Sequence, residues 1–183
     1  NKFEIQFQYN KNKLVPFGEF LPFEKTVSNL GLKKITEGHG SFSRGEEAKV
    51  FVLDKLKLLP LICYEIIFPK LSQNQKQKNL IVNISEDAWF GETIGPSQHL
   101  AKVIFRAIEN NVFLIRSANK GFSVFVDNKG QIKKVLTPGE TGVIALDVPF
   151  INNVKTKHKI DLIFFTLLLT CVFIFIILNK NEN

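Results

Sequence analysis

The sequence predicts a mixed α/β sandwich followed by a separate membrane-spanning helix. Three observations predict this fold class: apolar runs of strand length alternate with a helical segment, a hairpin signal follows them, and residues 162–178 are almost wholly apolar. The 183 residues are enough for one domain with its own core. Because the chain has no methionine and opens within an expected strand, Phe3–Gln8, we expect it to be the C-terminal part of a longer protein.

The expected elements follow from the apolar pattern. Between residues 96 and 110, apolar side chains recur at spacings of three and four, which predicts a helix with Arg106 on its polar side. The turn sequence after residue 126 predicts a hairpin. We expect strands at Phe3–Gln8, Val50–Leu53, Leu58–Ile62, Leu80–Ile84, Val112–Ile115, Phe122–Val126, Gln131–Leu136 and Thr141–Val148.

The composition excludes several kinds of site. The net charge of +7 comes from scattered lysines and accompanies no aromatic nucleic-acid-binding pattern, so we expect no nucleic-acid partner, and a membrane surface suits the charge better. The two cysteines, Cys63 and Cys171, form no disulfide framework. The three histidines, His39, His99 and His158, lie far apart without neighbouring ligands, so no metal site is expected.

Cys63 stands where an apolar strand ends and two polar residues, Tyr64 and Glu65, begin a short helix. A thiol at such a turn is partly exposed, near helix N–H groups that favour its thiolate. The alternative is a buried free cysteine that acts as a small hydrophobe.

Two further segments are candidates for function. The loop around Pro16 and Gly18 is unusually apolar and carries one carboxylate, Glu19, so it packs under another element or lines a pocket. Trp89 and Phe90 follow an expected strand, and this aromatic pair is either core packing or a flap over an apolar ligand.

We expect four segments: a domain at residues 1–150, a basic juxtamembrane linker at 151–161, a transmembrane helix at 162–178 and a polar tail at 179–183. The 17 residues of the helix are apolar except for Thr166 and Thr170. This length is near the minimum for a helix that spans a membrane, and the stretch is too apolar to lie on the water-exposed surface of a protein.

Five motifs together resemble one family. The chain is similar to the C-terminal part of the bacterial apolipoprotein N-acyltransferases, membrane enzymes with a nitrilase-type (carbon–nitrogen hydrolase) domain. The motifs that carry the resemblance are Tyr9–Glu19, Ile62–Glu65, Asp87–Gly91, Ile94–His99 and Arg116–Asn119.

The resemblance implies a nitrilase-like αββα sandwich, partial in this chain, with a Glu-Lys-Cys triad. Cys63 matches the nucleophile, Lys11 the triad lysine and Glu19 a second essential carboxylate. Tyr64 and Glu65 match residues needed beside the nucleophile. Trp89 and Phe90 match a mobile aromatic segment at the lipid entrance. The family's triad glutamate lies upstream of the lysine, and only Glu4 precedes it closely here, so we expect the general base and the earlier membrane helices to lie outside this chain.

The implied reaction is ping-pong acyl transfer. A phospholipid acylates Cys63, and the thioester then acylates the N-terminal amine of a diacylglyceryl-modified apolipoprotein. The missing N-terminal half of the same enzyme is the further expected partner. The implied location is the bacterial inner membrane with the domain in the periplasm, although the lysines before residue 162 would favour the cytoplasm for a short segment.

Two other functions remain open from the residues. One is a nitrilase-type amidase that acts on a small soluble amide, against which the apolar C-terminal helix argues. The other is a non-catalytic membrane-tethered module that keeps the fold without the base.

Overall fold

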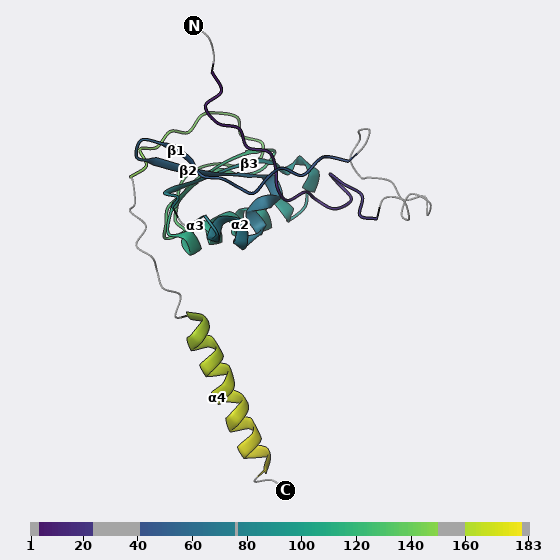
Figure 1. Cartoon of the computed structure of the whole chain (residues 1–183), viewed down its shortest axis with the longest axis vertical. Coiled ribbons are helices and arrows are strands. Elements are labelled where there is room, and N and C mark those ends of the chain that lie inside the picture. The colour runs from purple at the N-terminus through teal and green to yellow at the C-terminus, as the bar shows by residue number, and fades with distance from the viewer. Residues whose placement is uncertain (1–3, 24–40, 76, 150–159, 181–183) are drawn as a thin grey trace. The chain divides into compact units, whose positions relative to one another are not determined.

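The computed structural model describes residues 4–23, 41–75, 77–149 and 160–180 (Figure 1). The chain divides into two compact units, Asn1–Asn153 and Val154–Asn183. The predicted basic linker at 151–161 lies outside the described residues, except where the last helix begins at Ile160.

Within the described part of the first unit, six strands form one sheet in chain order. The strands are β1 (Phe51–Leu53), β2 (Leu56–Ile62), β3 (Leu80–Glu86), β4 (Phe113–Asn119), β5 (Ser123–Val126) and β6 (Ile132–Leu136). The pairs β2–β3 and β3–β4 are parallel, and the other three pairs are antiparallel. The predicted α/β class is therefore confirmed, and the strands expected within residues 50–136 are present.

The parallel pairs require crossovers, and helical segments supply them. The segments are η1 (Cys63–Ile67) and α2 (Pro69–Gln73) between β2 and β3, and η2 (Asp87–Phe90) and α3 (Gly95–Asn110) between β3 and β4. Helices α2 and α3 lie on one face of the sheet (Figure 1). Because strand side chains alternate between faces, every second residue of β2 enters this core, as the buried Leu59 and Leu61 show.

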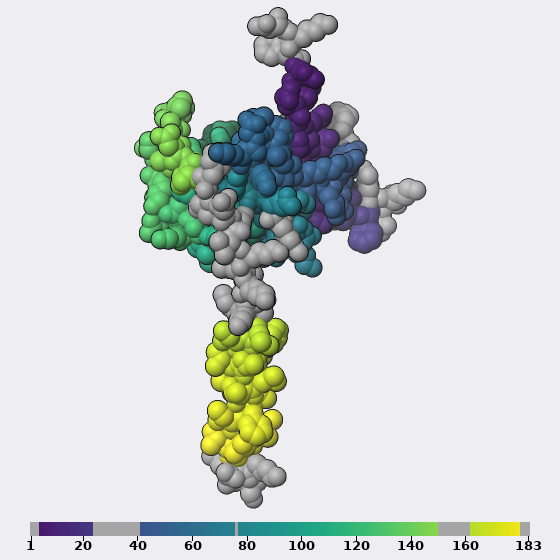
Figure 2. All heavy atoms as spheres, turned by 60° about the vertical axis from the view of Figure 1, so that its left-hand side comes forward, coloured from purple at the N-terminus to yellow at the C-terminus, as the bar shows by residue number. Residues whose placement is uncertain are grey.

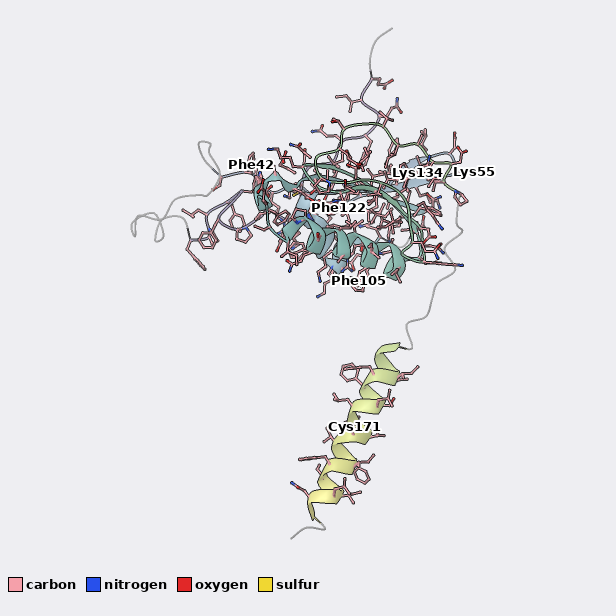
Figure 3. All side chains as sticks on the ribbon, turned by 180° about the vertical axis from the view of Figure 1, so that it is seen from behind. Phe42, Lys55, Phe105, Phe122, Lys134 and Cys171 are labelled. Atoms are coloured by element: carbon pink, nitrogen blue, oxygen red, sulfur yellow. The ribbon has the colours of Figure 1, made fainter. Side chains whose placement is uncertain are left out.

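Helix α3 packs on the sheet through Val103 and Ala107, which are fully buried, while Phe105 points away from the sheet on the outer side (Figure 3). The prediction that Arg106 lies on the polar side of this helix is wrong. Arg106 is buried, and its Nε donates a hydrogen bond to the carbonyl of Ile66, 3.0 Å away. The guanidinium thus satisfies a backbone acceptor of η1 that the sheet does not pair.

The hairpin between β5 and β6 forms as predicted around Asp127. The Asp127 carboxylate accepts hydrogen bonds from the backbone N–H groups of Lys129 and Gln131 at 2.9 and 2.8 Å. Gly130 adopts a φ of 81°, a left-handed conformation that glycine takes without strain.

Two of the predicted strands are absent, and the predictions for them are wrong over their described residues. Residues 4–8 and Thr141–Val148 form no strand. In the later segment Ile144, Leu146 and Val148 are partly buried while the residues between them are exposed. The alternation that predicts a strand is therefore real, but within the described part of the chain no backbone group of another strand pairs with this segment, which accepts a hydrogen bond only from the Lys134 side chain, at the carbonyl of Ala145. A strand requires a paired backbone.

The second unit contains α4 (Ile160–Lys180), on which Cys171 is labelled in Figure 3. Within α4, the stretch Leu162–Asn179 is long and apolar enough to cross a membrane. The hydroxyls of Thr166 and Thr170 donate to carbonyls one turn earlier, at 2.8 and 2.7 Å, so they leave no unsatisfied donor in an apolar environment.

Candidate functional site

The three parallel strands end at the same edge of the sheet, and a cavity of about 430 Å³ lies there. In open α/β sheets, ligands bind at this carboxyl edge. The cavity is lined by Cys63 directly after β2, by Glu86 and Trp89 from the end of β3 and η2, by Asn119 from the end of β4, and by Glu19 from the apolar loop.

Cys63 is the first residue of η1 and is partly exposed. Its φ is 51°, a left-handed conformation that costs a non-glycine residue roughly 1 kcal/mol. The Sγ atom lies 4.0 Å from the carbonyl oxygen of Glu86. Since the thiol faces a cavity, this placement disagrees with the alternative of a cysteine buried as a core hydrophobe.

Lys11 and Glu19 form an ion pair, with Nζ and Oε1 2.6 Å apart and side chains only 11% and 15% exposed. The other carboxylate oxygen of Glu19 accepts the backbone N–H of Val15 at 2.9 Å. Glu19 and Ile62 line both the Cys63 cavity and a second cavity of about 520 Å³ that Lys11 lines. The structure therefore brings the predicted thiol, lysine and carboxylate to adjoining cavities.

Glu65 is fully buried and holds the Lys11 loop against the Cys63 turn. Its carboxylate accepts hydrogen bonds from the Tyr9 hydroxyl at 2.9 Å, from the N–H groups of Asn12 and Lys13 at 2.6 and 2.9 Å, and from the N–H of Ile62 at 2.8 Å. Burial, together with the nearby Glu65 carboxylate, raises the pKa of Tyr9. Glu65 thus links residues 9–13 to the end of β2.

The remaining predicted residues differ in their surroundings. Trp89 is 53% exposed and lies against Gly18, where an added Cβ would be 3.0 Å from the indole. Core packing therefore does not describe Trp89. Tyr64 and Phe90 instead contact the buried His99 ring, with centroids 6.2 and 5.5 Å away.

A buried polar network lies beside the site, and the sequence motifs that contain Asp87, His99 and Arg116 did not predict that these side chains meet. Asp87 is its centre: the carboxylate accepts hydrogen bonds from Ser85 at 2.7 Å and from Arg116 at 2.6 and 2.7 Å, and it contacts His99 Nδ1 at 3.0 Å. Arg116 also donates to Asn83. A charged residue within the apolar β4 segment was the signal for this network, since a buried charge requires a partner.

The network predicts acid sensitivity. Burial alone would raise the pKa of Asp87, but the hydrogen bond with His99 and the charge of Arg116 hold it at about 2, below its ordinary 3.8. The folded carboxyl binds its proton less readily than the unfolded one, so its stabilisation is present above about pH 4 and is lost as the pH falls toward 2. In urea unfolding, the stability difference between wild type and Asp87→Asn should therefore shrink across this range. The same substitution at the exposed Asp54 is the control, and a difference that stays constant down to pH 2 would contradict the prediction.

The N-terminal segment lies against the segment that follows residue 41 (purple and blue in Figure 2), and Gly45 allows the backbone at Lys11 to approach closely. Its N–H donates to the carbonyl of Lys11 at 2.8 Å, and a Cβ at this position would lie 2.3 Å from the carbonyl oxygen of Asn10. Gly45→Ala should lower the free energy of unfolding by about 1–3 kcal/mol. Gly142→Ala, whose Cβ meets Leu136 at an ordinary 3.7 Å, is the control, and equal thermal midpoints for the two variants would refute this account.

Comparison with known proteins gives close relatives. The chain is 44% identical over 146 residues to the apolipoprotein N-acyltransferase of Rhizobium etli, covering 79% of this chain and 27% of the relative. It is 43% identical over 137 residues to that of Rhizobium rhizogenes, covering 74% and 26%. The chain thus spans only about a quarter of the length of these curated relatives.

Solved structures and a family profile agree on the fold. The NitN amidase of Nesterenkonia sp. AN1 superposes with a TM-score of 0.50 at 24% identity, over 71% of this chain and 47% of the amidase. This likeness shows the nitrilase-type fold. The carbon-nitrogen hydrolase profile matches residues 2–155, most of the sequence and the whole described sheet. The chain therefore belongs to the carbon-nitrogen hydrolase family.

Proposed function

We propose that this chain supplies the nucleophile-bearing part of an apolipoprotein N-acyltransferase, which transfers an acyl chain from a phospholipid to the N-terminal amine of a diacylglyceryl-modified apolipoprotein. The observation that carries the proposal is the grouping of Cys63, Glu19 and Lys11 at adjoining cavities on the carboxyl edge of the sheet. The identity to named relatives and the apolar helix α4 support it.

In the first half-reaction, the Cys63 thiolate attacks the ester carbonyl of the phospholipid and forms a C–S bond. The Lys11 ammonium stabilises the oxyanion, and Glu19 keeps this ammonium in place through the 2.6 Å ion pair. Collapse of the oxyanion breaks the C–O bond. The lysophospholipid leaves with the proton taken from the thiol, and a thioester remains on Cys63.

In the second half-reaction, the α-amine of the apolipoprotein attacks the thioester carbonyl. An amide bond forms, the C–S bond breaks, and the proton lost by the amine returns to the thiol. The exposed Trp89 at the cavity lies where an acyl chain would enter, since its indole offers a large apolar surface. No metal or diffusible cofactor takes part in this scheme.

The general base belongs to the proposal as well. We place it on a glutamate that precedes Lys11 in the whole enzyme and is not contained in this sequence. The chain alone should therefore form little acyl-enzyme. Robust acylation of the isolated chain by phospholipid would contradict this part of the proposal.

We also propose that α4 anchors the chain in the inner membrane and that the domain faces the periplasm. A cysteine introduced at the exposed Lys133 in a Cys63→Ala, Cys171→Ser background tests the orientation. An impermeant thiol reagent should label it in intact spheroplasts, whereas labelling only after lysis would place the domain in the cytoplasm.

The function itself is tested with a chimaera in which this chain replaces the matching segment of the Rhizobium etli relative. With labelled phospholipid and a diacylglyceryl peptide, the chimaera should transfer the acyl chain to the peptide amine. A chimaera that folds and hydrolyses small amides without acyl transfer would support the amidase instead. A folded chimaera without either activity would support the non-catalytic module.

A further inference from the structure

Asn83 connects the nucleophile turn to the buried network. It lies in β3, fully buried, and its side-chain amide donates hydrogen bonds to the carbonyls of Leu61 at 2.9 Å and Cys63 at 3.2 Å. The second of these carbonyls belongs to the nucleophile itself. Asn83 therefore contacts the backbone of Cys63 from within the core and does not itself line the cavity that Cys63 lines.

The amide of Asn83 can adopt only one orientation. Its carbonyl oxygen accepts a hydrogen bond from Arg116, and because a guanidinium only donates, the NH₂ group must face the two backbone carbonyls. Arg116 in turn has no freedom to move, since its side chain is fully buried and bonded to both oxygens of Asp87. The bonds from its two terminal nitrogens, one to Asn83 and one to Asp87, hold the plane of the guanidinium and with it the Asn83 amide.

The fixed Asn83 amide bonds to a residue whose backbone is strained. Cys63 holds a left-handed φ of 51°, and a residue keeps such a conformation only when its surroundings enforce it. The hydrogen bond from Asn83 fixes the Cys63 carbonyl and so restricts the direction of the Cα–Cβ bond that carries the thiol.

We propose that Asn83 is a positioning residue for Cys63, and that Arg116 and Asp87 fix its amide in the donating orientation. The inference rests on the proposed function only in taking Cys63 as the nucleophile. Its test measures the reactivity of the thiol, not acyl transfer, so failure of one proposal is distinguishable from failure of the other.

The test is the alkylation of Cys63 by iodoacetamide in the full chain in detergent, followed by peptide mass spectrometry. Asn83→Asp keeps the volume and the contact with Arg116 but donates to neither carbonyl, so the rate should fall about tenfold. Asn79→Asp is the matched control, because Asn79 also donates to a backbone carbonyl, that of Lys55 at 2.6 Å, away from the cavity. Its rate of Cys63 alkylation should equal that of wild type.

A conservative variant separates positioning from stability. Asn83→Ser keeps one hydroxyl donor but leaves a cavity and loses the Arg116 contact, so it should be less stable than Asn83→Asp yet alkylate faster. If the rates follow the order of thermal stability, or if Asn83→Asp alkylates like wild type, the proposal is wrong. Should Asn83→Asp fail to fold, Arg116→Lys replaces the two guanidinium nitrogens that serve Asn83 and Asp87 separately with a single ammonium. This variant must slow alkylation at least threefold, and an unchanged rate would overturn the proposal.

Discussion

Lys11→Met should lower acyl transfer by the chimaera about 10²–10³-fold, because it removes the ammonium that stabilises the oxyanion in the proposed mechanism. The ammonium is held by Glu19 at 2.6 Å, in surroundings where both side chains are largely buried. A positive charge acts strongly there, since little water screens it. The measurement is the initial rate of peptide acylation at saturating phospholipid.

The control for this variant is Lys49→Met. Lys49 also forms an ion pair, with Glu46 at 2.5 Å, but these side chains are 68% and 81% exposed. Its loss should leave the rate unchanged, since exposed pairs contribute little. Equal rates for the two variants would show that Lys11 carries no part of the chemistry.

Glu65→Gln should lower the free energy of unfolding by about 2 kcal/mol or more. One carboxylate oxygen accepts three hydrogen bonds, and the other accepts from the Tyr9 hydroxyl and the N–H of Ile62. In the variant the NH₂ group must replace one oxygen, and even in the better orientation it faces the Ile62 N–H. Two N–H donors then face each other, and no water can separate them because the side chain at position 65 is fully buried.

Glu65→Gln should also lower the rate of acyl transfer, because Lys11 lies between Tyr9 and Asn12, both of which bond to the Glu65 carboxylate. Denaturant unfolding measures the first effect and the chimaera assay the second. Glu140→Gln, at an exposed carboxylate that also accepts a backbone N–H, from Thr137 at 2.6 Å, should change neither. A Glu65 variant as stable as wild type would refute the structural role.

The central strands could be predicted because their apolar runs suffice to specify buried parallel strands. The candidate residues Cys63, Lys11 and Glu19 could be named from the sequence, but not their meeting at adjoining cavities, which depends on the fold. Glu65 could be named as a neighbour of the nucleophile, whereas its four hydrogen-bond contacts to residues 9–13 join positions more than 50 apart in the chain.

The failures have a common physical cause. Thr141–Val148 has the alternation of a strand, since its partly buried residues, Ile144, Leu146 and Val148, stand two apart. A strand also needs a hydrogen-bonded neighbour, and the periodicity of a segment does not show whether the fold supplies that neighbour. Arg106 is placed on the polar side of its helix by periodicity. It is buried because its guanidinium donates to the carbonyl of Ile66, a contact between segments 40 residues apart in the chain.

The claim that Cys63 carries the acyl chain has one most direct test. The chimaera is incubated with phospholipid in the absence of acceptor peptide and examined by intact and peptide mass spectrometry. We predict a mass increase of one acyl chain on Cys63 that hydroxylamine removes, that Cys171→Ser retains and that Cys63→Ala lacks. An acyl chain that forms on another residue, or that persists in Cys63→Ala, would contradict the account.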